Sequence, residues 1–153
     1  LGTYGYQQYE ISNYAKPGYM CRHNAGYWQR REYLGFGLGA SSLYRELRFS
    51  NTRRMQEYLT DSGKLEQIRK EVTVLSRNEQ IEEFMFLGLR MTEGISEKLF
   101  KETFGVRIMD IYGDILQKYE AIGFMEHIET KWCLTRKGIH VSNHILADFL
   151  LDE

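Results

Sequence analysis

The stretch IMDIYGDILQKYEAI, residues 108–122, carries the most regular hydrophobic pattern in the chain. Its apolar and aromatic side chains recur three and four residues apart, as they do on one buried face of an α-helix. They are Ile108, Ile111, Tyr112, Ile115, Leu116, Tyr119 and Ile122. Gly123 follows at once and favours a helix end. The stretch therefore predicts an amphipathic helix and a domain core in the second half of the chain.

Two further helices are predicted before this stretch. Ser76 and Glu79 have the S-x-x-E spacing of a capping box, which predicts a helix to about residue 91. Ser96 can cap a shorter helix, which Gly105 ends.

A hairpin and a closing helix are predicted after it. Two short strands, at residues 124–128 and 131–134, are joined by a tight turn. Thr135 can then cap a last helix through about residue 151. Three helices, a hairpin and a closing helix describe a winged-helix-like domain over residues 80–153.

The first 50 residues have a different character, because they hold eight of the eleven tyrosines and many glycines. A short strand is predicted at residues 6–11, and residues 33–42 are predicted to be a second strand that passes into a glycine-rich turn, with a loop at residues 12–28 around Pro17. Two strands and a loop bury too little apolar surface to fold alone, so we expect the end of a larger sheet or barrel. Residues 51–79 are predicted to be a connecting helix, at residues 52–62, and a linker.

The bulk composition is that of a globular chain, with 42% hydrophobic and 27% charged residues. No apolar run approaches the roughly 18–20 residues that span a bilayer, and the first residues do not resemble a signal peptide. Cys21 and Cys133 are too few for a disulfide framework. We therefore expect a reduced, cytoplasmic setting.

A winged helix raises DNA binding as a rival function, but the charges oppose it. Residues 1–79 carry 12 Lys and Arg against 8 Asp and Glu, whereas residues 80–153 carry 8 against 13. Affinity for DNA comes largely from neutralising phosphates. We therefore expect no nucleic-acid partner, and interpret residues 80–153 as a structural cap or docking surface.

Three segments of the first half, in order, are the most unusual of the chain: YEISNYA at residues 9–15, HNAGYW at residues 23–28 and LGFGLGASS at residues 34–42. This ordered set resembles the end of the catalytic barrel in radical S-adenosylmethionine proteins of the oxygen-independent coproporphyrinogen III oxidase family, on its haem-chaperone branch. The resemblance covers nearly the whole chain. The fold it implies is α+β: the last strands of a TIM-like barrel, at residues 1–50, and then the winged-helix-like domain.

The resemblance also implies site residues. The HNxxY motif of the haem-chaperone branch maps onto His23, Asn24 and Tyr27, with His23 as the axial ligand of haem iron. The glycine-rich turn, with Ser41, would border the pocket for S-adenosylmethionine or porphyrin together with Asn24 and Ala25. Many relatives carry His at the position of Ser41, so a role of that His does not transfer to this chain.

The cofactors implied for the parent protein are a [4Fe–4S] cluster, S-adenosylmethionine and haem. The cluster motif, Cys-x-x-x-Cys-x-x-Cys, does not occur in this chain and would lie upstream of it. We therefore expect no catalytic residue here and either no cofactor or weak haem binding. The partners implied are haem or porphyrin and, beyond them, a haem-accepting protein.

Simpler interpretations remain open at several of these positions. His23 is equally consistent with a loop histidine that is hydrogen-bonded to backbone, and the glycine-rich turn with a tight strand end. Glu10 fits a solvated strand end or a group facing a barrel interior. His140 and His144 are four residues apart on the predicted last helix but lack a third ligand, so we interpret them as surface residues.

Overall fold

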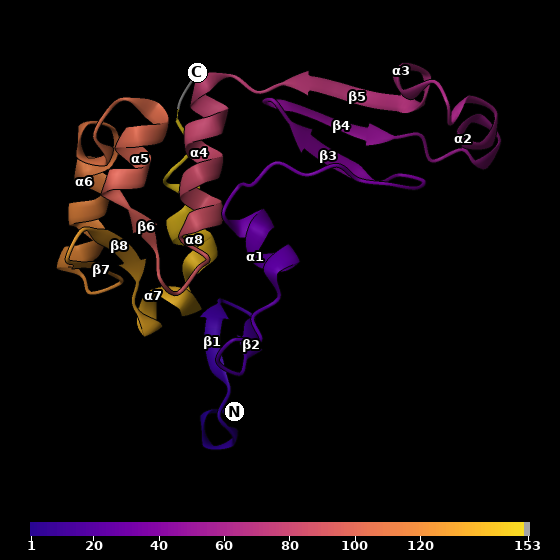
Figure 1. Cartoon of the computed structure of the whole chain (residues 1–153). Coiled ribbons are helices and arrows are strands. Elements are labelled where there is room, and N and C mark those ends of the chain that lie inside the picture. The colour runs from indigo at the N-terminus through magenta and orange to yellow at the C-terminus, as the bar shows by residue number, and fades with distance from the viewer. Residues whose placement is uncertain (152–153) are drawn as a thin grey trace. The chain divides into compact units, whose positions relative to one another are not determined.

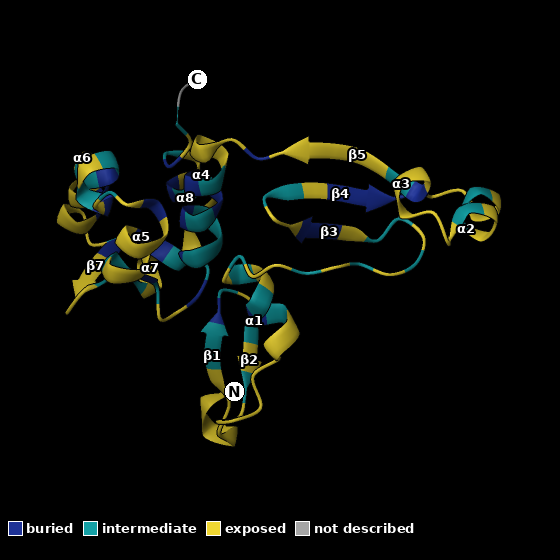
Figure 2. Cartoon of the chain, turned by 45° about the horizontal axis from the view of Figure 1, so that its top comes forward, coloured by how far each residue is buried: buried dark blue, intermediate teal, exposed yellow. Residues whose placement is uncertain are grey.

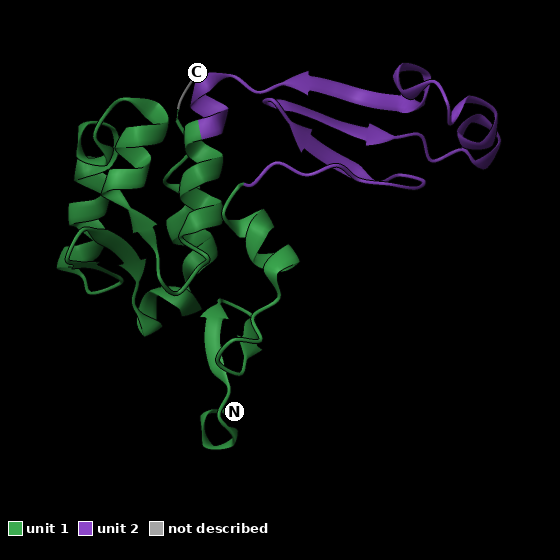
Figure 3. Cartoon of the chain, in the orientation of Figure 1, with its two compact units in different colours: residues 1–30, 81–153 green, residues 31–80 purple. Residues whose placement is uncertain are grey.

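The computed structural model describes residues 1–151 and has a mixed α+β architecture (Figure 1). The chain divides into two compact units (Figure 3). Unit 1 joins residues 1–30 to residues 81–153, and unit 2 holds residues 31–80. The mixed α+β class predicted from the sequence is confirmed.

The second half of unit 1 contains the elements predicted around residues 108–122. In chain order they are α4 (Arg77–Gly88, which begins in unit 2), β6 (Ile95–Ser96), α5 (Glu97–Phe104), α6 (Ile108–Ala121), β7 (Met125–Ile128), β8 (Lys131–Leu134), α7 (Arg136–His140) and α8 (Ser142–Ala147). The three strands form an antiparallel sheet in the order β6-β8-β7. Trp132 on β8 lies opposite Ile95 on β6 and His127 on β7.

The core of unit 1 is the apolar face that the sequence predicted for α6, joined by side chains from every neighbouring element. Ile108, Tyr112, Leu116 and Tyr119 are buried on α6. They pack with Met85, Leu89, Ile95, Phe100, Phe104, Met125, Trp132, Leu134, Ile145 and Phe149, among others. Figure 2 shows buried residues on the inner sides of these elements.

The predicted caps are confirmed. The hydroxyl of Ser96 accepts a hydrogen bond from the Leu99 N–H at the start of α5. The hydroxyl of Thr135 accepts one from the Gly138 N–H at the start of α7. Each cap satisfies a donor that the first turn of a helix leaves free.

The first 30 residues of unit 1 form a small hairpin and a helix. A short 3₁₀ turn, η1 (Gly2–Tyr4), leads into β1 (Gln7–Glu10), which pairs antiparallel with β2 (Asn13–Ala15). Helix α1 (Arg22–Trp28) follows. Strand β1 is also bonded to the segment after α4, because the Ile11 N–H donates to the Arg90 carbonyl and the Thr92 N–H to the Tyr9 carbonyl.

Unit 2 is a three-stranded antiparallel sheet with two short helices. Its elements are β3 (Ser41–Tyr44), β4 (Leu47–Asn51), α2 (Met55–Asp61), α3 (Leu65–Ile68) and β5 (Arg69–Val74), with strand order β3-β4-β5. Leu43, Phe49 and Ile68 are buried, whereas β5 is almost wholly exposed (Figure 2).

Four local predictions were wrong. The predicted loop at residues 12–28 contains β2 and α1. The strand predicted to begin at residue 33 and pass into a glycine-rich turn is only an isolated bridge at Tyr33, and the next strand, β3, begins at Ser41. The predicted linker contains β5. The single last helix is divided at Val141 into α7 and α8. The domain boundaries 1–50, 51–79 and 80–153 stay a prediction.

No helix within residues 1–151 is both long enough and apolar enough to cross a bilayer.

Candidate functional site

Helix α1 carries the HNxxY segment, so that four of the five predicted site residues share one helix. His23 and Tyr27 are four residues apart and therefore lie on the same face. Their rings meet edge to face, with centroids 4.7 Å apart. Both side chains are exposed, Tyr27 to 37%. The helix thus presents an imidazole and a phenol together to its surroundings.

The imidazole of His23 is available as a ligand. Within residues 1–151, neither of its ring nitrogens has a hydrogen-bond or ion-pair partner. The interpretation of His23 as a loop histidine bonded to backbone is therefore wrong. A neutral, accessible imidazole is what iron and other transition metals take as a ligand.

The other histidines differ from His23. The Nε2 of His127 lies 3.2 Å from a Glu97 carboxylate oxygen, and its ring stacks on Trp132. His140 and His144 are exposed, but they lie on the separate helices α7 and α8 rather than on one helix. Within residues 1–151 no three His, Cys, Asp or Glu side chains form a group that could hold a metal ion.

The opposite side of α1 faces the protein. Ala25 is only 2% exposed, and Asn24 is half-buried. Trp28, the last residue of the helix, lies against the Arg90 guanidinium, whose carbon is 4.3 Å from the ring centre. Arg30 follows and forms an ion pair of 3.1 Å with Glu83 of α4. The helix is therefore anchored at its C-terminal end, while His23 lies near its free N-terminal end.

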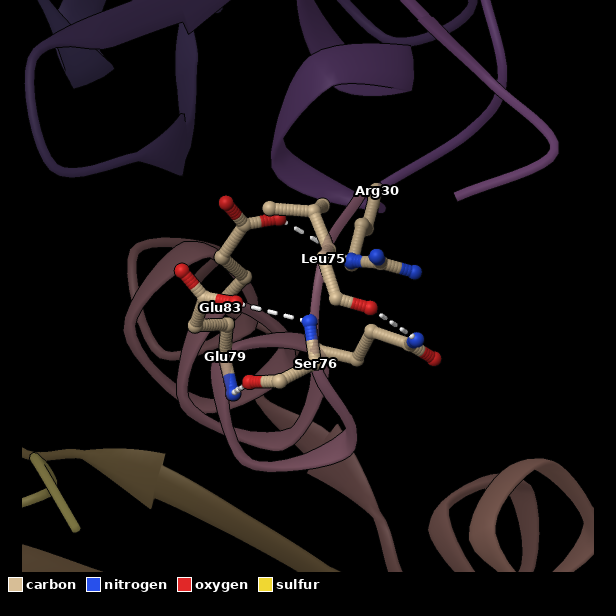
Figure 4. A network of polar contacts seen from close by, with 6 residues as sticks. Arg30, Leu75, Ser76, Glu79 and Glu83 are labelled. Carbon is tan, nitrogen blue, oxygen red and sulfur yellow. Dashed lines mark hydrogen bonds and ion pairs between the residues drawn. The ribbon is translucent and has the colours of Figure 1, made fainter. Parts of the chain in front are cut away.

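Figure 4 draws the Arg30–Glu83 pair and, separately, the capping box that starts α4. In the capping box the Ser76 N–H donates to the Glu79 carboxylate at 2.7 Å, and the Glu79 N–H donates to the Ser76 hydroxyl. This arrangement confirms the box predicted from the sequence. It also lowers the pKa of the exposed Glu79 carboxyl, chiefly through the bond from the Ser76 backbone.

Glu10 is neither solvated nor free. Its side chain is completely buried, and its carboxylate accepts bonds from the Ser12 N–H, the Asn13 amide and Arg90. Burial by itself raises the pKa of this carboxyl, but these bonds outweigh burial and hold the pKa below its usual range. The sequence analysis missed Arg90 altogether, since Arg90 lies 80 residues from Glu10 and in no motif.

The fifth predicted site residue, Ser41, belongs to unit 2 and is exposed at the start of β3. The glycine-rich turn before it is held from within unit 2. The Asn51 amide donates to the carbonyls of Gly35 and Gly37, and the Gly35 N–H donates to the Ser42 hydroxyl. A Cβ on Gly35 would lie 2.2 Å from the Ser41 carbonyl oxygen, so this glycine permits a close approach of two backbone segments.

The two cysteines do not form an iron–sulfur site. Cys21 is exposed just before α1, whereas Cys133 is buried on β8, where burial raises the pKa of its thiol. A [4Fe–4S] cluster is held by three or four thiolates. The residues of this chain therefore do not fit that cofactor.

The fold and the site together define a two-unit α+β protein that presents one accessible imidazole on an anchored helix. Comparison with known proteins identifies the class further. Residues 75–141 match the HemN C-terminal domain family. The chain is 34% identical to the heme chaperone HemW of Lactococcus lactis over 100% of its own length and 40% of that protein. It is also 34% identical to the heme chaperone HemW of Bacillus subtilis, over 98% of this chain and 40% of the relative.

A solved structure agrees with these sequence matches at the level of fold. Coproporphyrinogen III oxidase (HemN) from Escherichia coli, a radical SAM enzyme, superposes with a TM-score of 0.71 at 16% identity, over 98% of this chain and 38% of that one. Residues 75–141 therefore correspond to the HemN C-terminal domain, and the chain as a whole is similar to the C-terminal part of the heme chaperones HemW. It spans 40% of the length of the HemW relatives cited.

Proposed function

We propose that this chain is the C-terminal part of a haem chaperone and that α1 supplies the axial ligand, His23, to haem iron. One observation carries the proposal: the HNxxY segment is a helix that holds an unpaired, exposed imidazole beside Tyr27. The similarity to heme chaperones HemW along the whole chain supports the proposed kind of protein.

The residues of α1 fit a haem ligand set but form only one side of a pocket. An imidazole gives one bond to iron, whereas most affinity for a porphyrin comes from burying its apolar faces. Tyr27 offers aromatic surface next to His23, while Trp28 is already covered by Arg90. Haem binding by this chain alone is therefore weak. Of the other predicted pocket residues, Asn24 and Ala25 belong to α1 and Ser41 to unit 2, and their roles toward the ligand stay a prediction.

The whole protein further uses a [4Fe–4S] cluster and S-adenosylmethionine, as the class name of the family implies. Cys21 and Cys133 do not fit that cluster, so the thiolates belong to other parts of the protein. The chain described here contributes no catalytic residue. Its partners are haem or porphyrin and a haem-accepting protein, and its setting is the cytoplasm.

The finer architecture belongs to the same proposal. Residues 1–50 are the end of a TIM-like barrel, residues 51–79 a connection and residues 80–153 a winged-helix-like domain. The order α4, α5, α6, hairpin β7–β8 and α7 supports the winged helix.

Nucleic acid is not the ligand of this domain. The exposed residues of α6 include Asp110, Asp114 and Glu120, while Lys118 is engaged by Asp148 at 2.7 Å. Phosphate binding needs free cations on the surface that enters the groove. In a gel-shift assay at physiological salt we expect no binding tighter than the non-specific range of about 10⁻⁴–10⁻⁶ M.

Titration of the 153-residue chain with hemin tests the ligand assignment. Wild type is expected to give the sharp Soret band of histidine-ligated haem, and His23→Ala to leave only the broad spectrum of loosely associated porphyrin. His144→Ala is the matched control, because His144 is also exposed on a short helix of unit 1. If His23→Ala binds like wild type and His144→Ala does not, the ligand has been assigned to the wrong helix.

A further inference from the structure

We propose that Glu10 and Arg90 are positioning residues for α1: through the ring of Trp28 they fix the rotation of the helix and so the direction in which His23 points. The proposal rests on the proposed function for its purpose. Its geometry, however, stands on contacts within unit 1 alone.

The first step is the buried carboxylate of Glu10. One carboxylate oxygen accepts the Ser12 N–H at 2.9 Å and the Asn13 amide at 2.6 Å. The other accepts the Nε of Arg90 at 2.9 Å and its Nη2 at 2.6 Å. With four donors and no exposed surface, Glu10 has no capacity left for a ligand. Its role is therefore to hold Arg90.

The second step is the plane of the Arg90 guanidinium. Two bonds to one carboxylate oxygen fix that plane, and the backbone of Arg90 is fixed by the bond that its carbonyl accepts from the Ile11 N–H. Lysine could form the ion pair but not the planar surface, because its ammonium is a point charge. Arg90 therefore presents a flat cation at a defined position.

The third step is Trp28, whose ring lies 4.3 Å from the guanidinium carbon. The indole N–H of Trp28 is buried and has no hydrogen-bond acceptor among residues 1–151. No hydrogen bond therefore orients this ring, and its face-on contact with Arg90 is the specific interaction that seats it. Because Trp28 is the last residue of α1, fixing the position of its ring fixes the rotation of the helix about its axis.

The fourth step links this rotation to His23. Trp28 lies five positions after His23, which at 3.6 residues per turn places their side chains about 140° apart around the helix axis. Turning Trp28 onto Arg90 therefore turns His23 away from the body of unit 1. The Arg30–Glu83 pair, with side chains 9% and 7% exposed, is a second anchor at the same end. Groups that orient a metal ligand in this way typically change metal affinity when they are removed.

The experiment uses the 153-residue chain in a Trp132→Phe background, which leaves Trp28 as the single tryptophan. The variants are Arg90→Ala, Arg90→Lys and Glu10→Gln. Arg107→Ala is the matched control, since Arg107 also pairs with a carboxylate in unit 1 but is exposed and lies before α6. Each variant is assayed for Trp28 emission, for the ¹H–¹⁵N resonances of residues 22–28, and for hemin affinity by Soret titration.

Arg90→Ala is expected to shift the Trp28 emission, to move the α1 resonances and to weaken hemin binding about 10-fold, with the core resonances of α6 unchanged. Arg90→Lys and Glu10→Gln are expected to lie between Arg90→Ala and wild type, and Arg107→Ala to match wild type. A role in stability alone would lower the free energy of unfolding without moving the native α1 resonances. That outcome, or an Arg90→Ala hemin affinity equal to that of the Arg107→Ala control, overturns the proposal.

The two proposals fail in distinguishable ways. If hemin binding is indifferent to His23→Ala, the proposed function is wrong, whatever the Arg90 variants do. If His23→Ala abolishes the Soret signature while Arg90→Ala leaves the emission and the α1 resonances as in wild type, the ligand stands and the positioning role is wrong.

Discussion

The two units differ in the balance of apolar and polar side chains that they bury, although unit 1 also buries Glu10, Glu83 and Ser142. The interior of unit 1 is an apolar cluster of aromatic and aliphatic residues from α4, α5, α6, the sheet and α8. Unit 2 buries few apolar side chains, and beside them lie buried polar ones: Ser42, Ser50, Asn51 and Thr52. These polar groups are bonded: Asn51 to the glycine-rich turn, Ser50 to Glu71 and Thr52 to Glu57.

This difference indicates two sources of stability. The stabilisation from apolar burial grows with the area that is buried, and each fully buried large apolar side chain contributes about 1.5–3 kcal/mol. A buried hydrogen bond contributes less, but removing one partner leaves the other unsatisfied and costly. The stability of unit 1 should therefore depend on the volume of its buried apolar side chains, and the stability of unit 2 on the identity of a few buried polar residues.

The largest effect is expected in the core of unit 1. Phe100 is fully buried and contacts the rings of Phe84 and Phe104. Phe100→Ala should lower the free energy of unfolding by about 3–5 kcal/mol in urea denaturation, because it removes apolar contacts and leaves a cavity. Leu99→Ala, at the adjacent and 52% exposed position, is the control and should change it little. Similar losses in both variants would mean that this core is not where the stability resides.

A loss of intermediate size is expected in unit 2. Asn51→Ala removes both bonds to the glycine-rich turn. It leaves the Gly35 carbonyl without its donor and the Gly37 carbonyl with only the Ala40 N–H, at 3.5 Å. We expect a cost of about 1–3 kcal/mol, confined to unit 2. Amide exchange measures it: protection of residues 35–52 should fall while that of α6 persists. A parallel loss in α6 would show that the two units unfold as one.

A smaller effect is expected from acid, in the first 30 residues of unit 1. The pKa of Glu10 is lower in the folded protein than in the unfolded chain, where a glutamate has a pKa of about 4.3. The ionised carboxylate therefore stabilises the fold above about pH 4.3, and this contribution is lost as the pH falls through the lower, folded pKa. Trp28 emission in the Trp132→Phe background should change in that window. Glu10→Gln should abolish the transition, and persistence of the transition would assign it to another carboxyl.

The sequence predicted unit 1 better than unit 2, for a physical reason. Helix α6 can be predicted from the sequence because its apolar residues recur with the helical period over 14 residues. The caps at Ser96 and Thr135 are equally local. Strand β5, by contrast, shows no buried alternation, since it is exposed along both faces and is defined by pairing with β4. A pattern of burial cannot reveal a strand that buries almost nothing.

The candidate site was predicted only in part. The sequence named His23 and Tyr27 but placed them in a loop, because seven residues containing a glycine carry little helical signal. The residues that hold α1 in place are distant in the sequence. Glu83, which pairs with Arg30, lies 53 residues further along the chain, and Arg90 contacts Trp28. The burial of Glu10 could not be predicted either, because its partner Arg90 is also distant in the sequence. The break of the last helix at Val141 was not predicted.

The smallest effect, and the only gain in stability, is expected on α6 itself. Gly113 lies inside this helix, and a Cβ there would meet only the terminal methyl of Met109, at 3.6 Å. Gly113→Ala should therefore raise the free energy of unfolding by about 0.5–1 kcal/mol, because alanine loses less backbone freedom on folding. Gly138→Ala is the opposite case in the same unit, since its Cβ would lie 1.9 Å from the Phe124 carbonyl oxygen. Urea denaturation of both variants should give shifts of opposite sign. A loss in Gly113→Ala would mean that α6 has no room on that face and that unit 1 is packed more tightly than its buried side chains indicate.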